Sequence, residues 1–160
     1  MTDPIFWLFG ICVVTGVLAS AEDLWRRKVS NPIAVSAFVA GIVAQSIFGG
    51  LTGAGIALLG GLVGFVVFLV FYLLGGMGGG DIKLMAGFGA VIPGVDQVIT
   101  AAIMAALVGA VMALVFLAVR FVKKKLSPQG QITGSGLKSS IPYAPAITAG
   151  VLMSFAKHLP

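Results

Sequence analysis

The longest uncharged stretch, residues 29–80, contains 52 residues without a single Asp, Glu, Lys or Arg. As one α-helix it would measure about 78 Å at roughly 1.5 Å per residue, whereas the hydrocarbon core of a bilayer is only about 30 Å thick. The stretch must therefore contain two membrane-spanning helices. The glycine-rich residues 49–55 are suited to the turn between them, which predicts helices over about 32–48 and 56–74.

The composition of the whole chain has the same character. Of its 160 residues, 59% are hydrophobic and only 9% are charged, whereas an ordinary soluble domain has about 25% charged residues. This balance excludes a water-soluble globular protein. It predicts an all-α, polytopic membrane protein in which residues 1–160 form a single domain, with the lipid bilayer as its first partner.

About six segments are expected to cross the membrane. The four in addition to the pair above are residues 4–21, 84–95, 97–119 and 141–156. Segment 84–95 is short for a full crossing, so we expect it either to tilt in a thinned bilayer or to cross because Lys83 and Asp96 snorkel. The polar residues 120–140 are predicted to form a flexible loop.

The positive charges predict the orientation. With the N-terminus outside, nine of the ten Lys and Arg residues lie in cytoplasmic gaps and only Lys157 lies outside, so both termini are expected outside. Ala19-Ser20-Ala21 resembles a signal-peptidase site, but the positive charges follow the first apolar segment instead of preceding it, so we expect that segment to be retained. The same topology explains the net charge of +5 without a nucleic-acid partner.

Metal and cofactor chemistry has few residues available. Cys12 lies in the middle of an apolar segment and His158 lies near the end of the chain. Neither a disulfide framework nor a Cys/His zinc site can be built from one residue of each kind. We therefore expect no metal and no cofactor.

Two carboxylates, Asp23 and Asp81, are expected at the cytoplasmic ends of the first and fourth helices. A carboxylate at a membrane boundary is a functional candidate, although either can simply be solvated and Asp81 can simply cap its helix. Capping does not explain the five glycines in residues 75–80, which permit close approach of another backbone and suit a peptide-binding site. Two carboxylates that share one proton are what aspartic proteolysis requires.

Three motifs resemble those of the type IV prepilin peptidases, a family of GxGD intramembrane aspartyl proteases. Gly78-Gly79-Gly80-Asp81 fits the Gly-x-Gly-Asp signature, and its continuation through Ile82 to Leu84 resembles the prepilin peptidase version. Residues 23–31 resemble the other catalytic loop of the family, in which an Asp is followed by basic residues and then by Val/Ile-x-Asn. Residues 141–145, Ile-Pro-Tyr-Ala-Pro, resemble the entry into the last helix of the family.

The resemblance implies that Asp23 and Asp81 are the catalytic pair of a membrane aspartyl endopeptidase. Its substrates would be prepilin or pseudopilin precursors, cut after a glycine that follows their basic leader, at the cytoplasmic face of the bacterial inner membrane. Larger members also methylate the new N-terminus and carry paired cysteines in an extra region. This chain has neither that length nor those cysteines, so it resembles the short, peptidase-only form of Flp/Tad-type pili, with no methyltransferase or zinc-binding region.

Further residues near the pair are candidates for substrate binding or support: Gly78, Gly79, Gly80, Lys83, Arg26, Arg27, Asn31, Pro142, Tyr143 and Pro145. Lys83 could stabilise an ionised Asp81, and Arg26 or Arg27 an ionised Asp23, with positive-inside anchoring as the alternative. Pro142 and Pro145 either bend the last helix near the site or mark its start, and we favour the second interpretation.

Two hypotheses from other classes stay open. A small proton- or cation-coupled transporter would also use Asp23 and Asp81, but its carboxylates should lie near the bilayer midplane. A structural subunit of a pilus or secretion machine would use the two acids only as helix caps, and the glycines before Asp81 argue against it. In every case the small residues at four-residue spacing, as in Gly60/Gly64 and Ala105/Gly109, predict close helix packing.

Overall fold

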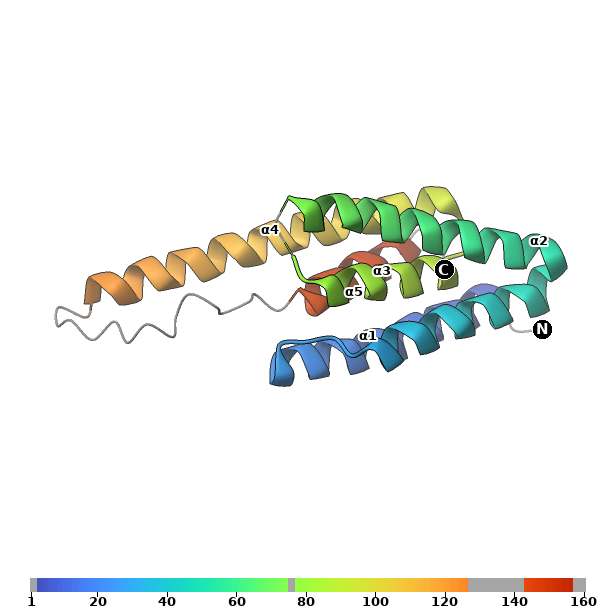
Figure 1. Cartoon of the computed structure of the whole chain (residues 1–160), viewed down its shortest axis with the longest axis horizontal. Helices are drawn as coiled ribbons and strands as arrows, with labels where there is room; N and C mark the ends of the chain where they lie inside the picture. The colour runs from blue at the N-terminus through green and yellow to red at the C-terminus, as the bar shows by residue number, and fades with distance from the viewer. Residues whose placement is uncertain (1–2, 75–76, 127–142, 157–160) are drawn as a thin grey trace.

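The computed structural model describes residues 3–74, 77–126 and 143–156 (Figure 1). In these ranges the chain forms α1 (Pro4–Arg26), α2 (Asn31–Leu73), α3 (Gly79–Val91), α4 (Val95–Leu126) and α5 (Ala144–Phe155). By length and composition α1, α2 and the part of α4 up to Val119 can each cross a membrane, whereas α5 is a shorter apolar helix. The predicted all-helical fold is therefore confirmed for the described residues, and the three long apolar helices agree with a membrane protein.

Helix α2 folds back on itself at Gly50. This glycine has φ 58° and ψ −143°, a left-handed conformation that glycine adopts without steric cost, whereas helical geometry continues on both sides. The second half of α2 returns along the first (Figure 1), and Gly53 lies so close to the carbonyl oxygen of Gln45 that a Cβ would overlap it. The predicted break within residues 49–55 is confirmed, as a turn at one residue instead of a longer loop.

Helix α3 is the central helix of the bundle, with nine of its 13 residues buried. It packs against both halves of α2 through positions that have no side chain. Gly60 lies against the backbone of Gly89, and Gly64 against the backbone of Met85, with no room for a Cβ at either glycine. Small residues let helix backbones approach closely in membrane proteins, so the predicted packing role of this glycine pair is confirmed.

The bounds predicted for this helix, residues 84–95, are wrong, because α3 begins five residues earlier and ends at Val91. At about 20 Å it is shorter than a flat hydrocarbon core of about 30 Å, so α3 would need a locally thinned bilayer to span it. The other helices enclose it, which the sequence did not predict. The Gln45 side chain donates to the carbonyl oxygens of Ala90 at 2.8 Å and Ile92 at 3.1 Å, so it satisfies carbonyl groups at the buried end of α3.

Helix α4 is longer than the predicted segment 97–119 and projects beyond the other helices (Figure 1). The prediction of a flexible loop over 120–140 is therefore wrong for residues 120–126. The reason is local, since three lysines are good helix formers and residues 120–127 contain no glycine or proline. The rest of the predicted loop, residues 127–140, lies outside the described residues.

Helix α5 packs on α4 and α1 through further small residues. Gly150 lies against the backbone of Ala105, and the Tyr143 ring lies over Gly109, where a Cβ would be 2.9 Å from the ring. These contacts confirm close packing at the predicted Ala105/Gly109 pair. They also show that the helix predicted over 141–156 has Tyr143 as its N-cap and begins at Ala144.

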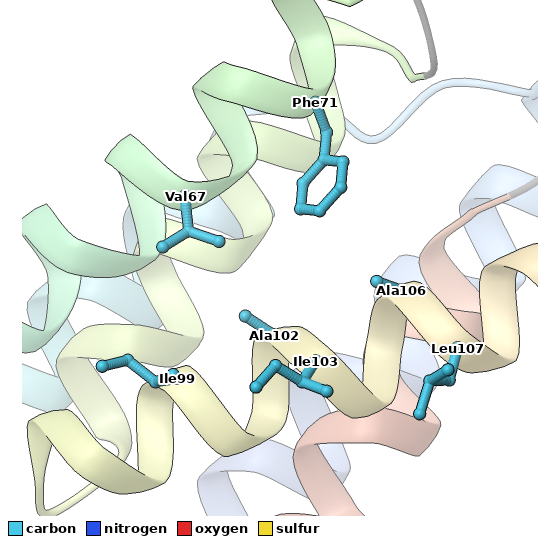
Figure 2. Close-up of a pocket in the computed structure, with 7 residues that line it drawn as sticks. All are labelled: Val67, Phe71, Ile99, Ala102, Ile103, Ala106 and Leu107. Carbon is cyan, nitrogen blue, oxygen red and sulfur yellow. The ribbon is translucent and has the colours of Figure 1, made fainter.

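An apolar groove of about 270 Å³ lies between the second half of α2 and α4 (Figure 2). Val67 and Phe71 on α2 face Ala102 and Ala106 on α4 across it. Every side chain that lines the groove is apolar, so it offers no group for acid, base or nucleophilic chemistry.

Candidate active site

The C-terminal end of α1, both ends of the folded-back α2 and the N-terminal ends of α3 and α5 lie at the same end of the bundle (Figure 1). Arg27 ends α1 with φ 53° and ψ 36°, and its N–H donates to the Asp23 carbonyl oxygen at 2.8 Å. The N–H of Ser30 donates to the Glu22 carboxylate at 2.9 Å, so the short link to α2 folds back against α1. The last turn of α1 and the first turn of α2 therefore lie at the same end of the bundle.

The first turn of α3 is tied to this link at two points. A Cβ at Gly80 would lie 3.2 Å from the Val29 carbonyl oxygen, so the absent side chain lets the two backbones approach. The Lys83 ammonium donates to the Asn31 side-chain oxygen at 2.9 Å. The expected close approach of another backbone to the glycines before Asp81 thus occurs at Gly80.

Asp81 lies in the first turn of α3 and is only 7% exposed. One of its carboxylate oxygens accepts the Gly78 N–H at 3.0 Å, so Asp81 does cap its helix. Burial raises the pKa of Asp81 to about 6, the Gly78 hydrogen bond opposes this shift, and the negative charge of Asp23 adds to it. A carboxyl group in this setting keeps its proton to a higher pH than an ordinary aspartate does.

Asp23 lies in the last turn of α1, which extends five residues beyond the predicted segment 4–21, and its side chain is 4% exposed. One carboxylate oxygen accepts the backbone N–H of Ala144 at 3.0 Å. Ala144 is the first residue of α5, where backbone N–H groups lack partners within the helix and the helix dipole is positive. Sequence reasoning missed this partner, because every residue type supplies the same backbone amide.

The structure brings the two acids to the same end of the bundle, where the charge of Asp23 acts on Asp81. Both are buried, although each belongs to a helix end that the sequence predicts at a membrane boundary. The charge of Asp23 thus opposes ionisation of Asp81. Such a pair can hold one proton between two acids, which suits general acid–base chemistry.

The basic residues expected to stabilise the acids have other contacts. Arg26 forms an ion pair with Glu22 at 3.8 Å, because residues four apart lie on the same helix face. Lys83, two residues after Asp81, faces another side of α3 and contacts Asn31. Arg26 therefore contacts Glu22 instead of Asp23, and Lys83 contacts Asn31 instead of Asp81.

Among the other candidate residues, Tyr143 and Pro145 have structural roles in α5, whereas Gly78 and Gly79 are exposed. Tyr143 packs against α4, and Pro145 lies in the first turn of α5, which agrees with a proline that marks a helix start. Gly78 and Gly79 are exposed, and the nearest atom to a Cβ at Gly79 would be in the Tyr72 ring, 4.0 Å away. Pro142 lies outside the described residues. Within the described ranges, no three His, Cys, Asp or Glu residues gather in a way that could hold a metal ion.

Comparison with known proteins identifies relatives of this chain. Residues 8–114 match the type IV leader peptidase family. The chain is also 31% identical over 80 residues to a preflagellin peptidase of Methanococcus voltae, in an alignment that covers 48% of this chain and 34% of that protein. The chain thus spans about a third of the length of this relative. No solved structure matches it significantly. Because the family match includes both buried acids and covers more than half of the 160 residues, the chain belongs to the type IV leader peptidase family.

Proposed function

We propose that this protein is a membrane aspartyl endopeptidase that removes the basic leader peptide from prepilin or pseudopilin precursors. The observation that carries the proposal is the burial of Asp23 and Asp81 at one end of the bundle, with the charge of one acting on the other. Membership of the leader peptidase family and the preflagellin peptidase relative both support a processing peptidase. The transporter hypothesis has less support, because both acids lie at helix ends instead of mid-helix.

In the proposed reaction Asp23 is the ionised acid and Asp81 the protonated one. A hydrogen bond from the N-terminus of α5 stabilises a charged carboxylate, and burial favours the proton on Asp81. Asp23 takes a proton from water while the water oxygen bonds to the carbonyl carbon of the scissile peptide. Asp81 gives its proton to the carbonyl oxygen. Collapse of the tetrahedral intermediate breaks the C–N bond, the leaving nitrogen takes the proton held by Asp23, and one hydroxyl of the intermediate returns a proton to Asp81, which leaves a carboxylic acid and restores both acids.

The substrate backbone is proposed to bind beside Gly78 and Gly79, immediately before Asp81. Both glycines are exposed, and at Gly78 the nearest atom to a Cβ would be a carboxylate oxygen of Asp81, 3.4 Å away. An extended peptide can therefore approach the acid without a side chain between them. A glycine before the cleaved bond would let the substrate backbone approach equally closely.

The site is proposed to face the cytoplasm, with both termini outside, in the inner membrane of a bacterium. Support comes from Arg26, Lys28 and Lys83 near the site and from the lysines at positions 123–125, where α4 extends past the same end of the bundle (Figure 1). We further propose that residues 1–160 form a single membrane-embedded peptidase domain of the Flp/Tad-like type.

Co-expression with candidate prepilins, read by the gel shift of the shortened product, tests the proposal. Wild-type protein should cleave, while Asp23→Asn and Asp81→Asn should each reduce cleavage by about 1,000-fold or more, because a pair with one amide can neither share a proton nor activate water. Asp96→Asn is the matched control, since Asp96 is an exposed acid in the first turn of α4. Substantial turnover by either variant of the pair would exclude the aspartyl mechanism.

A further inference from the structure

Thr148 is a buried polar residue on α5, 9% exposed, and it connects this helix to α1. Its hydroxyl donates to the carbonyl oxygen of Ala144 in its own helix at 2.8 Å and lies 3.3 Å from the carbonyl oxygen of Gly16 on α1. It also shares a hydrogen bond with the Ser20 hydroxyl at 3.2 Å. A Cβ at Gly16 would overlap the Thr148 methyl group, so the two helices interlock at this level.

These contacts lie one turn away from the bond between Asp23 and Ala144. On α1, Ser20 precedes Asp23 by three residues, so the two side chains lie on neighbouring parts of the same face. On α5, Thr148 follows Ala144 by four residues and thus lies one turn further along. The hydrogen bond between Ser20 and Thr148 and the hydrogen bond between Asp23 and Ala144 therefore lie on neighbouring turns of the same α1–α5 interface.

We propose that Thr148 and Ser20 are positioning residues for Asp23, which set the register of α5 on α1 so that the Ala144 N–H points at the carboxylate. The neighbouring apolar and glycine contacts of this interface have little directionality, so they allow a helix to slide or rotate by a small step. A hydrogen bond between helices resists such a step, because a hydroxyl released into an apolar interface loses its partner. The effect on kcat that we expect rests on the proposed function. The effect on hydrogen exchange at Ala144 rests only on the geometry of the interface.

The expected effect is on turnover more than on binding. A carboxylate displaced by about 1 Å can lose on the order of 100-fold in rate, so Thr148→Val and Ser20→Ala should each lower kcat by about 10- to 100-fold. The KM for prepilin should change less than about threefold, because neither residue lies beside the exposed glycines where substrate is proposed to bind. Thr148→Ser keeps the hydroxyl and should restore kcat to within about threefold of wild type. The double variant should be little worse than either single variant, since both residues act through one contact.

Ser154→Ala is the matched control. Ser154 is also a buried hydroxyl on α5, but its hydrogen bond goes to Val151 within the same helix, at 2.7 Å. This variant should keep the kcat of wild type. If Thr148→Val and Ser154→Ala lowered kcat equally, or if Thr148→Ser failed to restore it, the positioning role would be refuted. Ser20→Ala, on the other helix, keeps the test valid if Thr148→Val does not fold.

Hydrogen–deuterium exchange of the peptide that contains Ala144, measured by mass spectrometry on the full-length protein in detergent, gives the second readout. Thr148→Val and Ser20→Ala should speed exchange at this amide by at least about tenfold, and Ser154→Ala should leave it unchanged. Inactive wild-type protein with this exchange pattern would refute the proposed peptidase and support the positioning role of Thr148 and Ser20. Unchanged exchange in both test variants would refute the positioning role, whatever the activity.

Discussion

The carboxylate of Asp23 accepts the backbone N–H of Ala144 at 3.0 Å, across 121 positions of sequence. This contact joins the last turn of α1 to the first turn of α5 in a buried setting. It gives the acid a partner at the positive end of a helix, and it gives the helix an acceptor for one of its free amides. The first prediction follows from this double role.

Asp23→Ala should destabilise the protein more than Asp23→Asn does. Alanine leaves the Ala144 N–H buried without its acceptor, which costs about 1–3 kcal/mol, whereas asparagine keeps a carbonyl oxygen at that position. Thermal unfolding in detergent should therefore show the larger loss of melting temperature for alanine. Equal melting temperatures would mean that the contact contributes nothing to stability.

Asp81→Asn should stabilise the protein at pH 7.5 and have little effect near pH 4. In wild type the pKa of Asp81 rises from its ordinary value of 3.8 to about 6, so the free energy of unfolding should fall as the pH rises through this range. The loss amounts to at most about 3 kcal/mol. Asparagine carries no charge and still accepts the Gly78 N–H, so its unfolding should lack this fall. Melting curves of both proteins across the range measure it, and parallel pH profiles would contradict it.

Gly80→Ala should be less stable than Gly79→Ala, although the two positions are adjacent in the first turn of α3. Both gain helix propensity, by roughly 1 kcal/mol. At Gly80 the new methyl meets the backbone of Val29 at 3.2 Å, whereas at Gly79 it meets nothing closer than 4.0 Å. We expect a difference of about 1–2 kcal/mol in unfolding free energy. Gly80→Ala at or above the stability of Gly79→Ala would show that α3 can shift away from the α1–α2 link.

Reporter fusions should place the site end of the bundle in the cytoplasm. Fusions after Lys28, Lys83 and Lys125 should give a cytoplasmic signal, because the basic residues concentrate there. Fusions at Gly50, where α2 turns, at Gly94 between α3 and α4, and at the C-terminus should give an outside signal. A cytoplasmic signal at Gly94 would contradict the proposed orientation.

Cysteines at positions 23 and 81 should be linked by a short bifunctional reagent. The test starts from Cys12→Ala, which removes the one native thiol, and adds Asp23→Cys and Asp81→Cys. A shared proton needs the acids close together in the active arrangement, so addition of a prepilin should strengthen the link. Ser20→Cys with Thr148→Cys is the positive control, because these hydroxyls lie 3.2 Å apart. A linked control without a link between 23 and 81, with and without prepilin, would mean that the acids form no common site.

The sequence by itself determined the local features of this protein. Its low charge required a membrane, the length of the uncharged stretch required two helices within it, and the glycines around Gly50 located their turn. The glycines before Asp81 likewise indicated the start of a helix and a close backbone contact. Each of these conclusions depends on hydropathy, length or backbone freedom, which are properties of short segments.

Only the tertiary structure decided which helices are enclosed and which groups meet. An apolar helix surrounded by lipid and one surrounded by protein have the same hydropathy, so the enclosure of α3 could not be read from its residues. The partners of Asp23 and Lys83 depend on how the helices are rotated against one another. The partner of Asp23 is also a backbone N–H, which is the same in every residue except proline, so the identity of Ala144 does not reveal its role. Long-range packing therefore supplies the geometry of the site, since it sets which face of each helix end points inward.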